Sequence, residues 1–228
     1  MKLASLVSGG KDSLYATYLA KIHGHAIEFL LVMIPDNKES YMFHGHNLHL
    51  LETISEITSI PLITGTTKGV KEDELADLRN LLEKVLGKVD GITTGAVASN
   101  YQKTRIDDIC KDLRLQSIAP FWSRDPETVL REMLAAGFEM IIVAVGAPPL
   151  DESWLGRRID EDCIKELVAL NRKHGIHIMG EGGEYDTLVT ACPLYNGKKI
   201  FIEDAKKIWD SKTRSGSLVI KKFRVEVQ

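Results

Sequence analysis

The chain has 228 residues, of which 44% are hydrophobic, so it can bury a core and its length suits one large domain or two small ones. Its 29 basic and 32 acidic residues give a net charge of -3 without a long basic run, which argues against nonspecific nucleic-acid binding. Three widely spaced cysteines, no apolar stretch of membrane-spanning length and no signal peptide predict a soluble protein of the reducing cytoplasm, with neither a disulfide framework nor a zinc knuckle.

The first predicted strand, residues 3–7, leads through a glycine-rich loop into a predicted helix. The loop consists of Ser8, Gly9, Gly10, Lys11, Asp12 and Ser13. Glycines permit backbone angles closed to other residues, and the first turn of a helix offers N–H groups with partial positive charge. The loop therefore predicts a phosphate site rather than a tight turn with a helix cap, the simpler alternative.

Register excludes two familiar phosphate loops. A Walker A loop would need glycine where Ser5 stands and Ser or Thr where Asp12 stands, and no G-x-G-x-x-G follows the strand. The sequence SGGKDS instead resembles the PP-loop of the ATP pyrophosphatases, which cleave ATP between its α and β phosphates. This resemblance covers about the first half of the chain.

The second predicted strand, residues 26–33, is nearly continuous apolar sequence, as expected for a strand covered on both faces. By analogy with nucleotide-binding folds, the backbone at Met33 and Ile34 should lie near adenine. The next segment contains His44, His46 and His49, but no cysteine or carboxylate lies among them. They predict polar or substrate-facing side chains rather than a metal site.

Further along, we expect helices from 47 and over 71–86, strands over 61–64 and 91–96, and a helix beginning near Ser99. Thr94 and Gly95 could approach the nucleotide. Arg105, one turn beyond Tyr101, is interpreted either as a contact to phosphate or acidic substrate or as an exposed ion pair. The alternation over residues 1–118 predicts an α/β fold with a doubly wound, mainly parallel sheet.

A domain boundary is expected after Trp122, giving an ATP-binding domain over 1–122 and a smaller α/β substrate-recognition domain over 123–228. Asp125 and Pro126 predict a helix start, residues 139–145 a buried strand, and residues 160–174 a helix ended by Gly175. The last strands, 199–203 and 217–227, change hydrophobic phase, which predicts a bulge near residues 221–222.

A second cluster, GEGGEYDT over residues 180–187, holds three glycines and three acids in eight residues. Glycines would let the backbone approach a ligand, and Glu181, Glu184 and Asp186 could bind a metal, a cationic substrate or ammonium. The alternative is a glycine-rich surface loop with solvated carboxylates.

With both clusters, the chain resembles the diphthine-ammonia ligase family nearly end to end. The stretches that carry the resemblance are SGGKDS, YMFH over 41–44, GAVASNYQ over 95–102 with Arg105, PFW over 120–122, Leu155-Gly156 and GEGGEYDT. Asp186 departs from the glutamate expected there, and Phe121 from the more usual leucine. Larger eukaryotic members carry extra C-terminal domains that these 228 residues do not contain.

The resemblance implies ATP-dependent amidation of the diphthine carboxylate on translation elongation factor 2 with ammonia, through an acyl-adenylate, giving diphthamide, AMP and pyrophosphate. Lys11, Asp12, Glu181 and Glu184 would be catalytic, and the PP-loop residues with Ile34 and Gly95 would bind ATP, with Mg²⁺ on Asp12. The substrate would contact residues of several segments: His44, Tyr101, Gln102, Arg105, Glu181, Gly182, Gly183, Glu184 and Tyr185.

Glu181 and Glu184 would face the trimethylammonium group of diphthine or ammonium, and Tyr185, Trp122 or Trp154 would offer a cation-π surface, although core packing is favoured for Trp154. Two alternatives stay open: an RNA-thiolating PP-loop enzyme, disfavoured because no C-x-x-C is present, and a non-catalytic ATP sensor. The sequence leaves open whether the chain is a homo-oligomer and which molecule supplies ammonia. No nucleic-acid or membrane partner is expected.

Overall fold

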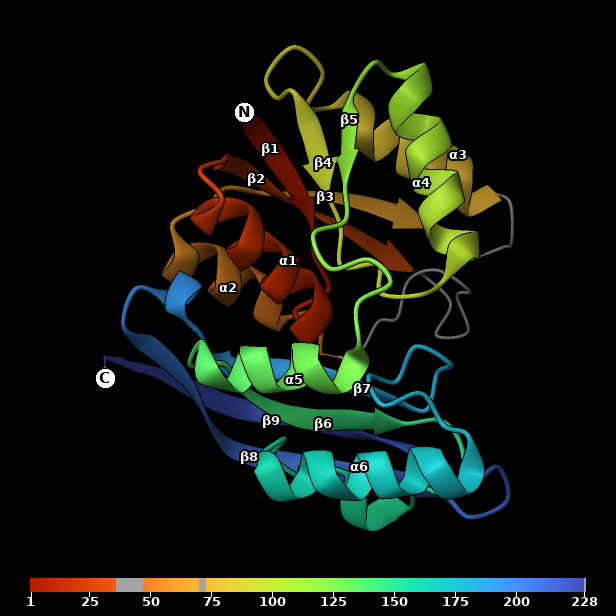
Figure 1. Cartoon of the computed structure of the whole chain (residues 1–228). Helices are drawn as coiled ribbons and strands as arrows, with labels where there is room; N and C mark the ends of the chain where they lie inside the picture. The colour runs from red at the N-terminus through yellow and green to blue at the C-terminus, as the bar shows by residue number, and fades with distance from the viewer. Residues whose placement is uncertain (36–46, 70–72, 228) are drawn as a thin grey trace. The chain divides into compact units, whose positions relative to one another are not determined.

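The structure is a computed structural model that describes residues 1–35, 47–69 and 73–227 (Figure 1). The chain divides into two compact units, Met1–Trp122 and Ser123–Gln228. Each unit has its own sheet and its own helices, and each is described separately.

The N-terminal unit is built on a five-stranded sheet in the order β3-β2-β1-β4-β5, in which every described pairing is parallel. Its strands are β1 (Lys2–Leu6), β2 (Ala26–Pro35), β3 (Leu62–Thr67), β4 (Gly91–Thr93) and β5 (Gln116–Ile118). Its helices are α1 (Lys11–Ile22), α2 (Leu50–Thr58), α3 (Asp73–Glu83) and α4 (Asn100–Asp112). The predicted doubly wound parallel sheet is confirmed.

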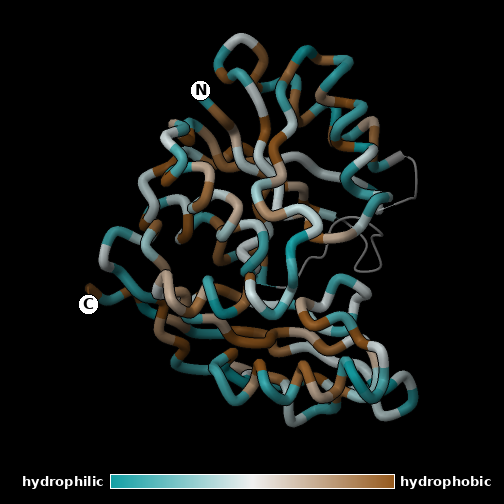
Figure 2. Tube along the Cα trace, in the orientation of Figure 1, coloured by the Kyte–Doolittle hydropathy of each residue, from teal (hydrophilic) through white to brown (hydrophobic). Residues whose placement is uncertain are grey.

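Helices cover both faces of this sheet, with α1 and α2 on one face and α3 and α4 on the other (Figure 1). The centre of β2, Leu30 to Met33, is buried, as the continuous apolar sequence predicts for a strand covered on both sides. On the second face, Leu31 and Met33 pack in a cluster with Leu78 of α3 and Ile106 of α4. In Figure 2, which has the orientation of Figure 1, brown hydrophobic residues are found along the strands as well as on the helices.

The strand order places the phosphate loop at a topological switch point. The chain moves from β1 outward to β2 and β3 on one side, and then returns to place β4 and β5 on the other side of β1. In sheets of this kind, ligands bind outside the carboxyl ends of the strands where the order reverses. The loops that follow β1 and β4 therefore lie at the edge where a nucleotide is expected.

The C-terminal unit has an antiparallel sheet whose order β6-β7-β8-β9 closes, because β6 pairs with both β7 and β9. Its elements are α5 (Pro126–Ala135), β6 (Glu139–Val145), the 3-10 helix η1 (Glu152–Trp154), α6 (Glu161–His174), β7 (Tyr185–Ala191), the 3-10 helix η2 (Pro193–Tyr195), β8 (Lys198–Asp210) and β9 (Ser215–Val227). Helices α5 and α6 lie against this sheet (Figure 1) and are joined by an ion pair between Arg131 and Glu161.

Local signals explain where the C-terminal helices begin and end. The Asp125 carboxylate accepts the Thr128 N–H at the start of α5, and Asp160 accepts the Cys163 N–H at the start of α6. Gly175 ends α6 with a positive φ of 74°, which glycine adopts without strain. The predicted bulge is confirmed, since Asp204 pairs with Lys222 and Ala205 with Ile220, so that Lys221 has no partner in the register.

Several element bounds differ from the sequence prediction. The strand β4 ends at Thr93 rather than at residue 96, and β8 continues to Asp210, well past residue 203. Strand β5 was not among the predicted elements. Within the described ranges, no helix combines the length and apolar character that crossing a membrane requires.

Candidate functional site

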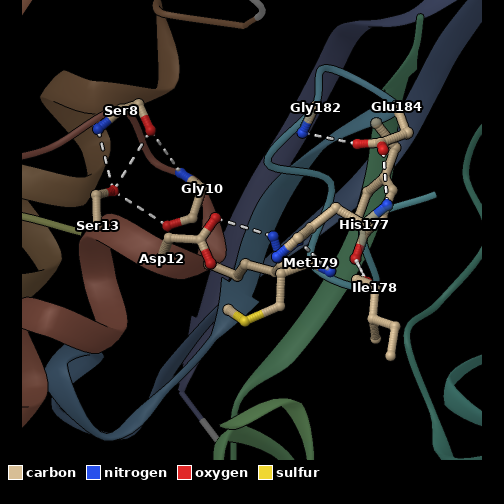
Figure 3. Close-up of polar contacts among 11 residues, drawn as sticks. Ser8, Gly10, Asp12, Ser13, His177, Ile178, Met179, Gly182 and Glu184 are labelled. Atoms are coloured by element: carbon tan, nitrogen blue, oxygen red, sulfur yellow. Dashed lines mark hydrogen bonds and ion pairs between the residues drawn. The ribbon is translucent and has the colours of Figure 1, made fainter. Parts of the chain in front are cut away.

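The loop between β1 and α1 is held in shape by its own hydroxyl groups. The Ser13 hydroxyl donates to the Gly10 carbonyl oxygen at 3.1 Å and accepts the Ser8 N–H at 3.1 Å, as Figure 3 shows. Gly9 has a φ of 81°, in the region that favours glycine. The loop that is predicted to bind phosphate is therefore held by its own hydrogen bonds, and Ser13 contributes two of them.

The start of α1 is suited to bind an anion. Gly10 is the N-cap residue and has no side chain to accept the N–H groups of the first turn. Those groups carry the positive end of the helix dipole and lie at the switch point of the sheet. A phosphate group could accept the hydrogen bonds that the side chain of a Ser or Asp cap accepts in other helices.

Lys11 and Asp12 form an ion pair at the beginning of α1. The Lys11 Nζ atom lies 2.9 Å from the Asp12 Oδ2 atom, and the Lys11 side chain is only 2% exposed. An ammonium group held at a helix N-terminus adds positive charge where the dipole is already positive. The pair thus places a cation and a carboxylate side by side at the helix N-terminus, where a phosphate group is predicted to bind.

A hydrogen-bonded chain beneath the loop joins β1 to α1. The Thr17 hydroxyl donates to the Ser13 carbonyl oxygen at 2.7 Å, and the Ser5 and Thr17 hydroxyls are 2.6 Å apart and buried. Neither Ser5 nor Thr17 was predicted to support the loop. The available signal was one hydroxyl side chain among the apolar residues of β1 and another among those of α1. Such buried hydroxyl groups need hydrogen-bond partners, so the two could have been expected to bind each other.

Gly95 lies in the loop after β4 and packs directly on the start of α1. A Cβ atom at this position would lie 2.5 Å from the Asp12 carbonyl carbon and 2.6 Å from the Ser13 backbone nitrogen. The absence of a side chain therefore lets two backbones meet. This contact gives Gly95 a structural role. Its contact with ATP stays a prediction.

Helix α4 follows the same loop and begins at a Ser99 cap, whose hydroxyl accepts the Gln102 N–H at 3.4 Å. The guanidinium carbon of Arg105 lies 3.4 Å from the centroid of the Tyr101 ring, so these two predicted substrate residues stack on each other. The Trp122 ring, proposed as a cation-π surface, has the Lys103 ammonium 5.6 Å from its centroid.

Two further predicted site residues are Ile34 and His44. Ile34 is partly buried near the end of β2, where it pairs with Thr66 of β3. His44, together with the rest of the YMFH segment, lies outside the described residues. The predicted contacts of Ile34 with adenine and of His44 with substrate stay predictions.

In the C-terminal unit, Glu184 closes the glycine-rich loop on itself. Its carboxylate accepts the His177 N–H at 2.7 Å and the Gly182 N–H at 2.8 Å, and its side chain is buried (Figure 3). Both carboxylate oxygens thus hold backbone N–H groups. We interpret Glu184 as the residue that fixes this loop.

The same loop has further internal hydrogen bonds. The Tyr185 hydroxyl donates to the Ile178 carbonyl oxygen at 2.7 Å, and the Met179 N–H donates to His177 Nδ1 at 3.2 Å. The Gly183 N–H donates to the Gly180 carbonyl oxygen at 3.0 Å. Segment 177–184 is therefore held by its own hydrogen bonds, and the sequence offered no signal for the part that His177 plays in them.

Each glycine of the loop has a packing or conformational reason. A Cβ atom at Gly180 would lie 2.6 Å from the Tyr185 carbonyl oxygen, and one at Gly182 would lie 2.7 Å from Glu184 Oε1. Gly183 has a φ of 80°. The abundance of glycine thus follows from the fold of the loop and does not by itself indicate a ligand.

The three acids of this cluster do not converge on one point. Glu184 is buried in the loop and Glu181 is partly exposed. Asp186 alternates with the buried Tyr185 and Thr187 along β7 and so lies on the opposite face of the strand. In the part of the chain that the structure describes, no group of three His, Cys, Asp or Glu side chains could hold a metal ion. A metal site built from these three acids is therefore excluded.

The aromatic residues proposed as cation-π surfaces are engaged within the protein. Tyr185 is 2% exposed. Trp154 is buried with the Arg157 guanidinium 4.3 Å from its ring centroid, as the preferred core interpretation of this residue predicts.

All three cysteines are buried and reduced. Burial raises the pKa of Cys110 to about 12, of Cys163 to about 11 and of Cys192 to about 12. Their thiols are therefore protonated at neutral pH, so they lack the thiolate that nucleophilic sulfur chemistry requires.

Comparison with known proteins decides the family. The model of the diphthamide synthase N-terminal domain matches residues 1–117, and that of the C-terminal domain matches residues 125–226. The chain belongs to the diphthamide synthase family. The predicted resemblance and the enzyme class, a ligase, are thereby confirmed.

Individual relatives agree with this assignment. The chain is 36% identical to the diphthine--ammonia ligase of Rattus norvegicus and 35% identical to that of Homo sapiens, each over 91% of this chain and 85% of the relative. It is 33% identical to the enzyme of the same name from Schizosaccharomyces pombe, over 91% of this chain but 37% of the relative.

A solved structure titled as a predicted subunit of tRNA methyltransferase from Methanocaldococcus jannaschii shares a TM-score of 0.42 and 18% identity, over 85% of this chain and 98% of that one. This likeness is too distant to inform function.

Proposed function

We propose that this chain amidates the diphthine carboxylate of translation elongation factor 2 with ammonia at the cost of ATP, giving diphthamide, AMP and pyrophosphate. The observation that carries the proposal is the preformed SGGKDS loop at the N-terminus of α1, beside β4 at the switch point of the sheet. Membership of the diphthamide synthase family supports the choice of substrate. The modification of a translation factor would take place in the cytoplasm.

The carboxylate must first be activated, because it is a poor electrophile and resists attack by ammonia at neutral pH. We infer that a carboxylate oxygen attacks the α-phosphorus of ATP, the bond to the β-phosphate oxygen breaks, and pyrophosphate leaves. Ammonia then attacks the acyl carbon of the adenylate, loses a proton, and the carbon–oxygen bond to AMP breaks. The two steps form one amide bond and consume one ATP.

The phosphate loop supplies the donors for the first step. Backbone N–H groups at the start of α1 and the Ser8 hydroxyl would bind the β and γ phosphates, while Ser13 keeps the loop in shape. Lys11 would neutralise the charge that grows on the departing pyrophosphate. Nucleotide binding would thus exchange the contact between Lys11 and Asp12 for contacts to the ligand.

Asp12 fits a magnesium site of the kind that accompanies nucleotides. Such an ion takes one or two carboxylates together with phosphate oxygens and water, so a single aspartate beside the phosphate loop is sufficient. The ion would offset phosphate charge when bound.

In the C-terminal unit, the proposal assigns different roles to the two glutamates. Glu184 fixes the loop through two backbone N–H groups. The partly exposed Glu181 is then the acid of this loop that would face the trimethylammonium group or ammonium. Tyr101, Gln102 and Arg105 remain our candidates for further substrate contacts.

The two rival functions make different demands. An RNA-thiolating enzyme would need a reactive thiol, and burial keeps the three thiols protonated. A non-catalytic sensor would bind ATP without cleaving it.

The test is release of AMP from ATP in the presence of ammonia and diphthine-bearing factor. Lys11→Ala and Asp12→Ala should each lower turnover by at least about 100-fold, the loss typical of removing one electrostatic contact to a transition state. Lys21→Ala, an exposed position in the last turn of α1, is the matched control and should leave turnover unchanged. Near-normal turnover of both loop variants would remove the roles assigned to them.

A further inference from the structure

The end of the β8-β9 hairpin carries an exposed surface that the proposed chemistry does not use. We define this hairpin patch as Lys206, Ile208, Lys212, Arg214, Val219 and Lys221, all of which are exposed. Ile208 is 51% and Val219 37% exposed, which is unusual for two branched aliphatic side chains on one face of a strand pair. The patch therefore has an aliphatic centre.

Strand register sets which residues share this face. Lys206 pairs with Val219 and Ile208 pairs with Ser217, so these four residues lie on one face of the hairpin. The intervening residues of β9, Leu218 and Ile220, are buried on the opposite face. One face of the hairpin thus packs on the core, and the other face exposes Ile208 and Val219 to solvent.

The patch is positively charged in a chain that is otherwise acidic. Residues 204–221 contain five basic and two acidic side chains, a net charge of +3, whereas the whole chain has a net charge of -3. The remaining residues together therefore carry -6. A basic rim around an aliphatic centre complements a partner surface in which acidic side chains surround an apolar one.

The register also places the patch at the same end of the sheet as the glycine-rich loop. Tyr185, which follows that loop, pairs with Val145 at the end of β6, and Val145 pairs with Gly216. Gly216 in turn pairs with Trp209 at the end of β8. Three steps between neighbouring strands, about 4.8 Å each, separate the loop from the far strand of the hairpin, a path of about 15 Å.

We propose that the hairpin patch docks an acidic surface of the protein substrate next to the modified residue. The proposal rests on the proposed function, because it requires the substrate to be a protein. A single modified side chain offers few contacts, and binding energy from remote parts of a substrate can hold the reacting group in place. A patch about 15 Å from the loop is close enough to contact the same partner.

A nucleic acid fits the patch less well. Single-stranded nucleic acids bind to exposed aromatic rings on which their bases stack, whereas the exposed centre here consists of Ile208 and Val219.

The test measures binding of the intact diphthine-bearing factor and, separately, steady-state turnover. The double variant Lys206→Glu/Lys212→Glu and the single variant Ile208→Ser change exposed side chains only. Each should raise both Kd and KM for the intact factor, the double variant by about tenfold or more, with kcat unchanged. Turnover of a short diphthine-bearing peptide, which does not reach the patch, should not change.

The control is Lys21→Glu/Lys111→Glu, which makes the same charge change at exposed positions of the N-terminal unit and should bind the factor as the wild type does. Unchanged Kd in both hairpin variants, or an equal rise of KM with the short peptide, would overturn the docking proposal. So would tighter binding to mixed-sequence RNA than to the factor, or self-association that the hairpin variants abolish.

Failure of the proposed function has a different signature. If the wild type binds the factor but makes no AMP, the amidation is wrong, while the Kd values of the variants still decide the docking. If the wild type turns over the short peptide but does not bind the intact factor, the docking is wrong and the amidation stands.

Discussion

The substitution Glu184→Gln should open the loop over residues 177–184 without unfolding the C-terminal unit. In the native loop, the two carboxylate oxygens accept the His177 and Gly182 N–H groups at 2.7 and 2.8 Å. An amide keeps one oxygen but directs an NH₂ group at the other N–H, and it removes the negative charge. One backbone N–H is then left facing another donor.

The expected magnitude follows from these two bonds. A hydrogen bond to a charged group contributes about 1.5–3 kcal/mol, so the loss of one such bond and the weakening of the other should cost about 2–3 kcal/mol. At about 1.4 kcal/mol for each factor of ten, the population of the open loop should rise about 30- to 100-fold. The effect is local, because the other loop contacts, such as that from Tyr185 to Ile178, remain.

Hydrogen exchange measures this opening directly. The His177 and Gly182 amides should exchange about 30- to 100-fold faster in Glu184→Gln, while amides in the centre of β7 keep their rates. Glu181→Gln is the matched control, since the partly exposed Glu181 should change substrate affinity with little effect on exchange. Wild-type exchange rates in Glu184→Gln, or equal acceleration in Glu181→Gln, would refute the assignment of Glu184 as the loop-fixing residue.

Two further predictions concern the N-terminal unit and the thiols. Gly95→Ala should lower AMP formation by about 100-fold, because a Cβ atom 2.5 Å from the Asp12 carbonyl carbon must displace the start of α1 by about 1 Å. The control is Gly65→Ala, whose Cβ atom would meet only side-chain atoms, the nearest at 3.3 Å. Equal activities of the two variants would contradict the contact of Gly95 with α1. The three thiols should resist iodoacetamide at pH 8 in the native protein and react in denaturant, and rapid native labelling would contradict their burial.

The same thiols predict a pH dependence of stability. Burial raises each folded pKa above the value of 9.0 expected for an exposed thiol, so the unfolded chain loses these protons first. Their contribution to stability is complete below pH 9 and declines as the pH rises from 9 towards 12. Chemical denaturation at pH 8 and pH 10 should show lower stability at the higher pH, and the reverse order would contradict this linkage.

Much of the fold could be predicted because it depends on local signals. The apolar run of β2, the Asp125 cap before Pro126 and the change of phase near Lys221 each determine a nearby backbone feature. Strand β5 was harder, since three residues with Gln116 exposed show no apolar alternation. The position of β4 beside β1 depends on contacts between segments far apart in the sequence, which no local pattern encodes.

The sequence draws attention to both candidate loops but does not reveal the contacts that hold them. SGGKDS predicts a phosphate loop because glycine, hydroxyl and charge occur together at the end of a strand. GEGGEYDT marks a special loop, yet its sequence does not reveal that Glu184 accepts the His177 N–H seven residues earlier or that Tyr185 donates to Ile178. Side chains that bind the backbone and side chains that bind a ligand are of the same types, so only the structure separates them.

The proposed amidation is tested by measuring AMP, pyrophosphate and amide product from ATP, with ammonia and diphthine-bearing factor each present or absent. Amide product should accumulate only with both present, with one AMP and one pyrophosphate for each amide formed. ATP bound without AMP release under any of these conditions would contradict it and indicate a sensor. AMP formation that is indifferent to the factor would contradict the assignment of the substrate.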